Sequence, residues 1–576
     1  MKRYPILARV RTELRCLEKV KKYPERVQAF NGEIPILDHL PGRDIVEPLV
    51  QTYLETYESV YHVLHVPSFW REYHQLWEDR GIVRPGFVAI VLLMISSVQG
   101  VSANVNMTAP ATRLVEHSAA VDWVAACENW LDSQSQKHLN LTYFQVSCLL
   151  FLSKRVNVIK AKRHWTSSGS LMRFAMSAGL HREPKHLFTK ITPFDAEMRR
   201  RVWATIVELE LQASVDRGMP SFSDIRSSDA EAPSNIFDEE MDESMQELPS
   251  SRPLTQFTGS SYLHISRKSL QLRAFLNQLI NDSGPHMELA HVLHYEEKIL
   301  QELQDLPKWD YRAAPDAQGI LRPRMVQTLL DIQLRQVLLL LHRRSSHEAA
   351  SSPQRDYSRG QSLNTAMSLI GQHHEFLTEV NAALNLLRDD VFRAALGLCY
   401  DLTCLDPRRG KHSPSMHSPL NLVDETLEKI LLTNPCNTER ACTLVDSALR
   451  ILEDKVMRLG GGLSQFSFVC TAFGCVKAKL TPNEAHVQEE LAADRMMSLY
   501  HKFLAIQANE SQGHEFVNGA KELTAINRVA GDGTQDAATF EGVVPELPEA
   551  PYLDPGIEEI NYADMDQWFL DDMWNF

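Results

Sequence analysis

The carboxylates best suited to hold a metal ion are Asp389 and Asp390, two adjacent residues in a helical stretch. Enzymes that process isoprenoid diphosphates hold several Mg²⁺ ions with clustered carboxylates, because departure of the diphosphate needs that positive charge. The cluster is incomplete here, since the fifth position of the stretch is Arg393 instead of a further Asp. An all-helical isoprenoid-processing enzyme is therefore a remote alternative, and we predict no catalytic, cofactor-binding or metal-binding residue.

Cysteine is another residue type that could bind metal. The chain has nine cysteines, widely spaced and with no Cys-x-x-Cys pair, so zinc ligation within this sequence is unsupported. Their odd number, and the apolar run around Cys148, indicate buried free thiols in a reducing compartment rather than disulfides. We expect an intracellular protein whose chain carries no cofactor.

Charge is concentrated towards the two ends of the chain. Residues 1–26 hold nine Lys/Arg against three Asp/Glu, whereas residues 529–576 hold twelve Asp/Glu and no Lys, Arg or His. This asymmetry indicates a basic arm and an acidic interaction tail. The alternative is that both segments are simply solvated.

The longest apolar run, Phe87–Ile95, is nine residues long. A membrane-spanning helix needs about 20 apolar residues. The run therefore predicts a buried core helix, and no membrane partner is expected.

The elements that must position these side chains follow one another as helices. Between residues 46 and 345 the alternating pattern of strands is scarce, and single Pro and Gly residues replace the Asn-Gly pairs of hairpins. Further helices follow to residue 510. We predict an all-α fold, a large multi-helix domain with a basic N-terminal arm and a disordered acidic C-terminal tail.

Two helices can be predicted in detail. The first ends at Gly179, where glycine suits the left-handed conformation that follows a helix. The second has Thr192 as its N-cap, Pro193 at the first helical position and Asp195 at the spacing of a capping box, and it ends at Gly218. The expected apolar faces are Leu171, Phe174, Ala175 and Ala178 in the first, and Met198, Val202, Ile206, Leu209 and Ala213 in the second.

The basic arm carries a short apolar repeat. The repeating residues are Leu7, Val10, Leu14 and Leu17. A helix of about two heptads is marginal alone in water. Two interpretations stay open: an arm packed on the main body, or the remnant of a linker or dimer helix.

Composition divides the chain into four segments. They are a basic arm or linker (1–45), a helical domain (46–345), a C-terminal helical region (346–510) and a disordered acidic-aromatic tail (511–576). We expect a loop at 224–247, where nine Asp/Glu accompany one Arg, and a polar break at 345–358. Further interruptions are expected at 407–419 and 460–462.

Three motifs, in this order along the chain, resemble the middle homology domain of fungal zinc-binuclear-cluster transcription factors. The first is a Leu-His-x-Pro-Ser-Phe turn after an aromatic helix. The second joins a Gly-Leu-His-Arg helix end, a Pro-Phe-x-x-Glu-x-Arg-Arg-Arg-x-Trp helix and a Gly-x-Pro turn, and the third is a Leu-rich helix at 333–344. The motif residues are His65, Pro67, Phe69, Gly179, Leu180, His181, Arg182, Pro193, Phe194, Glu197, Arg199, Arg200, Arg201, Trp203, Gly218 and Pro220.

The residues of the second motif have types and positions that predict structural roles. Trp203 lies between apolar positions and should fill core volume. His181 and Arg182, at a helix C-terminus, are placed to bond its free carbonyl groups. A catalytic His181 is not expected.

The three consecutive arginines cannot share one helix face. At 100° per residue, Arg199–Arg201 spread over about 300° of arc. We expect one or two of them to pair with Glu197 or Glu208, and one to be solvated. A direct nucleic-acid contact is the less favoured alternative.

The resemblance implies a regulatory domain that restrains or exposes an activation region and senses small metabolites. Members of the family normally carry a six-cysteine zinc module near the N-terminus, which inserts a helix into the major groove of DNA. This sequence contains none, so zinc is expected only if such a module is encoded upstream. Three explanations stay open: a start codon placed downstream of the true one, a DNA reader supplied by a partner, or weak phosphate binding by the basic arm.

The chain ends in alternating Asp and large apolar residues. Repulsion between carboxylates keeps such a segment extended, and its apolar side chains can fold into a partner's groove as a short helix. This composition is typical of an acidic activation region, whereas the alternative is a segment docked on the protein's own core. The candidate residues are Trp568, Phe569, Leu570, Asp571, Asp572, Met573, Trp574 and Phe576.

The sequence thus predicts a nuclear transcriptional regulator, favoured as an activator, of a fungal metabolic or secondary-metabolite gene cluster. Its expected partner is the transcription machinery, through the acidic tail, with DNA contacted weakly or through another protein. Alternatives are a cofactor or scaffold that does not bind DNA and a metabolite-sensing helical regulator. A small-metabolite effector and a homodimer stay open.

Overall fold

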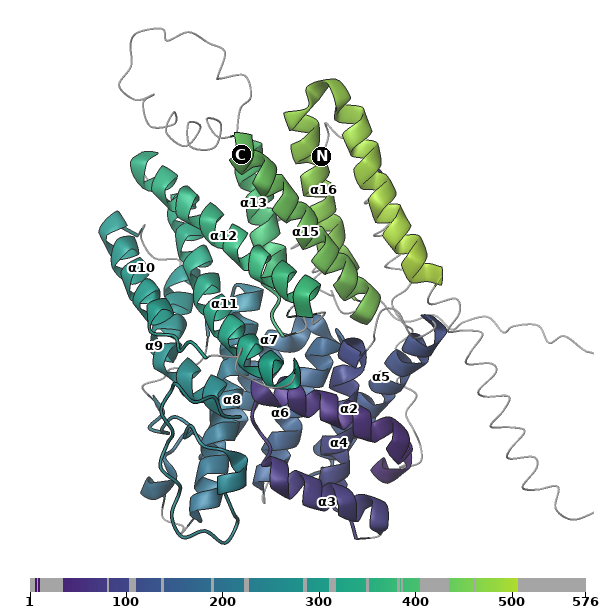
Figure 1. Cartoon of the computed structure of the whole chain (residues 1–576), viewed down its shortest axis with the longest axis vertical. Helices are drawn as coiled ribbons and strands as arrows, with labels where there is room; N and C mark the ends of the chain where they lie inside the picture. The colour runs from purple at the N-terminus through teal and green to yellow at the C-terminus, as the bar shows by residue number, and fades with distance from the viewer. Residues whose placement is uncertain are drawn as a thin grey trace, which may run out of the picture.

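The computed structural model shows an assembly of helices (Figure 1). Within the described residues the chain forms helices, turns and loops and no strand, so the all-α prediction is confirmed. The described residues are 6–7, 9–10, 35–79, 82–102, 110–135, 139–187, 191–221, 227–282, 287–309, 317–348, 352–380, 384, 387–404, 435–459 and 461–505. The acidic tail, including residues 568–576, lies outside them.

The first half of the chain supplies the lower part of the molecule as drawn in Figure 1. Its longer helices are α2 (Arg43–Glu55), α3 (Val66–Glu78), α4 (Pro85–Ser102), α5 (Pro110–Asp132), α6 (Leu141–Val156), α7 (His164–Ser177) and α8 (Pro193–Arg217). The short 3-10 turns are η1 (Ile36–His39), η2 (Tyr57–Ser59), η3 (Ala161–Arg163), η4 (Pro184–His186) and η6 (Asp238–Glu240).

The second half begins at the edge of this body and then builds the bundle above it (Figure 1). Its helices are α9 (Ser261–Asn281), α10 (Leu289–Gln304), α11 (Ala317–Glu348), α12 (Ser352–Val380), α13 (Val391–Cys404), α15 (Pro435–Leu459), α16 (Leu463–Leu480), the turn η10 (Pro482–Glu484) and a final helix at 485–505.

One apolar core joins the two halves, and a smaller one lies between α9, α10 and α11. Phe87–Ile95 forms part of α4 and is buried throughout, as the apolar run predicts. Leu7 and Val10 are also buried in the main core, which supports the packed-arm interpretation for this part of the arm. Leu14 and Leu17 lie outside the described residues.

Helix α8 is buried on nearly all sides. It packs against α6, α7 and α9, so that both its apolar residues and most of its charged ones are covered. The expected apolar face is buried, but residues on the other sides of the helix are buried as well, so the prediction of one buried face was incomplete. A one-sided pattern identifies a surface helix, whereas a central helix has no solvent face to reveal.

The expected polar break at 345–358 is wrong over 345–348 and 352–358, which are helical. Helix α11 continues to Glu348 and α12 begins at Ser352. Ser345 and Ser358 are fully buried, and their hydroxyl oxygens are hydrogen-bonded at 2.9 Å between the two helices. Small polar side chains that satisfy one another permit close helix packing, so polarity did not mark a loop here.

The other expected interruptions differ in outcome. Residues 228–247 contain no helix beyond the turn η6, as predicted for this loop. The turn before α16 is also confirmed, with Gly462 at φ 90°, a left-handed conformation that suits glycine. Residues 407–419 lie outside the described part of the chain. Within that part, no helix is long and apolar enough to cross a lipid bilayer.

The side chains of six cysteines are described, and all six are free thiols. Five of them are buried, and burial raises the pKa of the Cys148 and Cys399 thiols well above the ordinary value. Buried thiols of this kind are poor nucleophiles and redox centres, because the thiolate is the reactive form. The expectation of free thiols is confirmed for these six.

Candidate functional site: the buried charges around helix α8

The first motif is a helix N-terminus built on His65. The His65 side chain caps α3, Pro67 occupies its first turn, and Phe69 is buried against the Phe87 ring at 5.3 Å between centroids. His65 Nε2 lies 2.8 Å from the main-chain oxygen of Asp238, and Nδ1 lies 2.8 Å from the Ser68 hydroxyl. The motif therefore holds a distant loop.

Asp238 is where the first motif and α8 meet. Its carboxylate accepts hydrogen bonds from Arg201 Nη1 at 2.7 Å and from the Val66 main-chain N–H at 2.8 Å. His62 Nε2 lies 3.0 Å from the same carboxylate. The sequence placed Asp238 in an acidic loop, and nothing in that composition distinguished it from its eight acidic neighbours.

We call this group the Asp238 cluster. Its members are Glu58, His62, His65, Glu197, Arg201 and Asp238, and each is less than 9% exposed. Glu197 completes it by accepting from Arg201 Nε at 3.3 Å and from the Ser234 main-chain N–H at 2.9 Å. The central charge, Arg201, is 0% exposed.

The electrostatics of the cluster follow from burial. Burial opposes ionisation of Asp238, but His62, Arg201 and the Val66 N–H together hold its pKa well below the ordinary value. At Glu58 the balance is reversed, because burial raises its pKa to about 7 and His62 and the Leu64 N–H offset this only partly. The cluster is thus compensated at Asp238 and undercompensated at Glu58.

Each arginine of the triplet forms at least one bond within the protein. Arg200 forms an ion pair with Glu183, and Arg199 Nη2 donates to the Gly179 carbonyl at 3.2 Å. Arg201 is buried, and Arg199 and Arg200 are half-buried, so the expectation of one fully solvated arginine is wrong. The prediction that Glu208 pairs with one of these arginines is also wrong, because Glu208 pairs with a residue of α9.

Helix α7 is followed by a glycine in the left-handed conformation, and the two nearby residues Leu180 and Arg182 lie in different surroundings. Gly179 has φ 75°, and the Leu180 main-chain N–H returns to Ala175 O at 3.0 Å, which satisfies carbonyls of the last turn. Leu180 is buried. Arg182 lies 3.4 Å from Asp229 instead of bonding those carbonyls, a difference from the prediction that arises because the acidic loop folds back over this end.

The rest of the second motif packs along α8. Trp203 is 2% exposed and donates from Nε1 to the Ser228 hydroxyl at 3.1 Å, and the His181 ring lies 6.2 Å from it between centroids. Thr192 caps α8 by accepting from the Asp195 N–H at 3.0 Å, with Pro193 in the first turn. Phe194 meets the His65 ring edge-on at 5.0 Å, so the first two motifs are in contact.

Residues 50–322 match the fungal specific transcription factor domain. The chain contains this domain. Three similar proteins are Transcription factor opdR of Penicillium oxalicum (strain 114-2 / CGMCC 5302), Zn(2)-C6 fungal-type transcription factor mpsB of Macrophomina phaseolina (strain MS6) and Equisetin cluster transcription factor eqxF of Fusarium heterosporum.

The similarity to these relatives is broad and distant. Identity is 27% over 82% of this chain for opdR, 27% over 59% for mpsB and 26% over 64% for eqxF. The matched parts make up 60%, 46% and 55% of the relatives' own lengths. The chain therefore spans about half the length of the curated relatives it matches.

Two further groups of buried charge follow the Asp238 cluster along α8 of the domain. In the middle, Arg273 holds Glu208 through two hydrogen bonds of 2.7 and 3.1 Å, and Ser266 donates to the same carboxylate at 2.6 Å. Gln333, from the third motif, accepts from the Tyr262 hydroxyl at 3.1 Å beside them. This two-bond geometry is the strong form of the Arg–carboxylate pair.

The last turn of α8 is held from the upper bundle. Arg393 donates at 2.8 Å to the carbonyls of Val215 and Asp216 in the last turn, and Gly218 closes the helix with φ 68°. Arg155 pairs with the Asp216 carboxylate at 3.1 Å. Pro220 follows, and its carbonyl accepts from Trp165 Nε1.

The paired carboxylates considered for metal binding have protein partners. Asp389 pairs with Lys455 at 2.7 Å and Asp390 with His373 at 3.2 Å, while Arg393 reaches away to α8. Among the residues placed by the structure, no group of His, Cys, Asp and Glu has metal-binding geometry. Local sequence could not reveal these partners, because they come from α12 and α15.

We predict that Asp238→Asn lowers the free energy of unfolding by about 3–5 kcal/mol, because it leaves the buried Arg201 without its main counter-charge. The measurement is urea denaturation of the full chain. The matched control is Asp242→Asn, an exposed residue of the same loop, which should change stability by less than about 0.5 kcal/mol. Equal losses in the two variants would contradict the assignment.

We also predict a pH effect from Glu58. Its folded-state pKa of about 7 lies above the ordinary value of 4.5, so the folded state binds this proton more tightly than the unfolded state. Stability contributed by the proton is present below pH 4.5 and is lost as pH rises through 7, by up to about 3 kcal/mol.

The Glu58→Gln variant tests this effect. Glutamine keeps an acceptor for the Leu64 N–H and cannot ionise. The difference in melting temperature between the variant and the wild type should therefore grow in the variant's favour from pH 5 to pH 8. A difference that stays constant with pH would show that Glu58 does not titrate in this range.

Proposed function

We propose that this chain is a transcriptional activator of a fungal metabolic or secondary-metabolite gene cluster, working in the nucleus and without a catalytic centre. The observation that carries the proposal is the fungal specific transcription factor domain at residues 50–322. The names of the relatives agree, since each is a transcription factor and one is assigned to the equisetin cluster. Several charges around α8 are paired with one another, which supports a structural role for these side chains.

DNA reading is proposed to come from a six-cysteine zinc module encoded upstream or from a partner protein. One relative is named as a Zn(2)-C6 factor, and this sequence has nine cysteines without such a cluster. The motif arginines do not offer a phosphate-binding surface, since Arg199, Arg200 and Arg201 are bonded to Gly179, Glu183 and Asp238. Phosphate binding needs solvent-facing cations.

The transcription machinery is proposed to bind the acidic tail. Its aromatic and aliphatic residues alternate with Asp, and burying such a segment on the protein's own core would need several cationic partners. Binding would occur by folding into a hydrophobic groove of the partner.

We predict that residues 541–576, fused to a neutral DNA-binding module, activate a reporter gene. Replacing Trp568, Phe569 and Trp574 with Ala should abolish activation, because these side chains supply the apolar contact area. The matched control is Tyr552→Ala, an aromatic residue of the same fragment that lies outside the Asp-rich end. An inactive wild-type fusion would overturn the activation proposal.

A cofactor or scaffold that never contacts DNA is the second candidate, favoured by the missing cysteine cluster. A pull-down with promoter DNA separates the two functions. Retention of the purified chain that survives physiological salt supports direct reading, and retention only with a zinc-cluster partner supports reading through a partner. Retention under neither condition supports the second candidate.

A further inference from the structure

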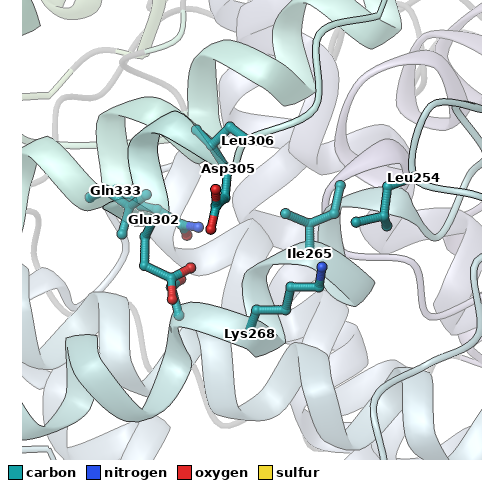
Figure 2. A pocket seen from close by; sticks show the side chains of 9 residues that line it. Leu254, Ile265, Lys268, Glu302, Asp305, Leu306 and Gln333 are labelled. Atoms are coloured by element: carbon teal, nitrogen blue, oxygen red, sulfur yellow. The ribbon is translucent and has the colours of Figure 1, made fainter. Parts of the chain in front are cut away.

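The hollow between α9, α10 and α11 is bordered by charged side chains that water already reaches. Its volume is about 110 Å³, and Figure 2 shows Lys268 and Asp305 on its border. Both residues are exposed, so their charges are solvated without a ligand. A tighter and less ordinary contact lies at the end of α6.

Three helices of the first half, α6, α7 and α8, end in the same hydrogen-bonded turn. One residue of each turn has a left-handed conformation: Val158, Gly179 and Gly218, with φ of 56°, 75° and 68°. The main-chain N–H of this residue bonds the carbonyl three residues back, and the next N–H bonds the carbonyl five residues back. Glycine adopts this conformation freely, so Val158 is the exception among the three.

A valine is unfavourable at this position. The left-handed conformation brings the Cβ atom of an L-residue close to the following carbonyl oxygen, and it is especially rare for side chains branched at Cβ. Lys160, two residues further on, is left-handed as well, with φ 50°. Backbone strain of this kind persists only where the surrounding structure over-determines the conformation.

The surrounding structure at Val158 is the turn between α15 and α16. A Cβ atom on residue 461 would lie 2.7 Å from Val158 Cγ2 and 3.2 Å from its Cγ1, so the valine side chain rests directly over Gly461. Gly461 itself is not left-handed, so its missing side chain provides space rather than backbone freedom. Val158 also packs against the main apolar core.

This contact joins two parts of the chain. Val158 belongs to the matched range 50–322, whereas Gly461 lies among the C-terminal helices. The packing of Val158 on Gly461 exists only while the two turns are together, and the strain at Val158 can be released only when they separate. Packing therefore favours a closed arrangement of the two turns, and strain favours an open one.

We propose that Val158 and Gly461 form a conformational latch: the α15–α16 turn holds the end of α6 in a strained form, and local separation of the two turns relaxes it. The conformation at the end of α6 thereby depends on the position of the C-terminal helices. Lys162 and Arg163 follow the strained turn and are exposed, so separation changes how these cations are presented at the surface. The inference goes beyond the proposed function and does not depend on it.

Two substitutions at Val158 separate strain from packing, with amide hydrogen exchange of the full chain as the measurement. Val158→Ala keeps a Cβ atom in the left-handed position but removes the methyl groups over Gly461, so exchange in both turns should become faster on the order of tenfold. Val158→Gly removes the strain as well, so exchange should be on the order of tenfold slower than in Val158→Ala. Mass spectrometry of peptides covering residues 155–163 and 457–465 reports on the two turns.

The order of these two variants decides between strain and simple packing. A contact without strain would be weakened further by glycine, because glycine is the more flexible residue. Exchange in Val158→Gly that equals or exceeds that in Val158→Ala would therefore overturn the proposal. Circular dichroism, with unchanged exchange in peptides from other helices, checks that both variants fold.

Gly461→Ala tests the contact from the other side. The added methyl group meets Val158, so exchange should rise in both turns, and adding Val158→Gly should reverse most of the rise. Gly371→Ala is the matched control, because a Cβ atom there meets no described atom within 4 Å beyond its own helix, and it should leave both turns unchanged. A rise confined to one of the two turns, or no rise in Gly461→Ala, would also contradict the latch. The comparison at Val158 stands even where Gly461→Ala fails to fold.

Discussion

A buried carboxylate must be compensated by buried positive charge, and Asp238 imposes that requirement on this protein. Arg201, His62 and the Val66 N–H meet it from three elements distant in sequence. The arrangement joins the turn before α3, the central helix α8 and the acidic loop. Removing Asp238 leaves the buried Arg201 with Glu197 as its counter-charge, and takes the hydrogen bonds of His62 and the Val66 N–H away, so the three elements depend on one another.

Buried polar groups elsewhere along α8 are also paired with oppositely charged side chains, and one of these side chains comes from outside residues 50–322. Glu208 and Arg273 form the middle group, and Arg393 of α13 holds the last carbonyls of the helix. Arg393 lies outside the matched range 50–322, and the main apolar core also includes residues from both halves. The domain and the C-terminal helices are therefore joined by charge and by packing. The predicted boundary at 345 stays a prediction.

Most of the fold could be predicted from local signals. Thr192, Pro193 and Gly218 identify the ends of α8 because caps act within one turn, and the run Phe87–Ile95 identifies α4. The predicted break at 345–358 failed because Ser345 and Ser358 satisfy each other between helices, which depends on α11 and α12 being neighbours.

The candidate site was predictable only in part. The motif residues were recognisable as a set, and the pairing of Arg201 with Glu197 follows from their spacing of four on one helix. Asp238, Arg273 and Arg393 were missed, because each comes from a separate element whose position is determined by tertiary packing. Composition predicted the loop at 224–247, but it gave no sign that Ile236 and Asp238 are buried in it.

The central claim is that Arg201 and Asp238 act as one compensated pair, and a double-mutant cycle tests it most directly. The free energy of unfolding would be measured for the wild type, Arg201→Met, Asp238→Asn and the double variant. We expect the double variant to be more stable than the sum of the single losses allows, with a coupling of at least about 1.5 kcal/mol. Losses that add to within about 0.5 kcal/mol would contradict the claim, since residues that do not depend on each other show additive effects.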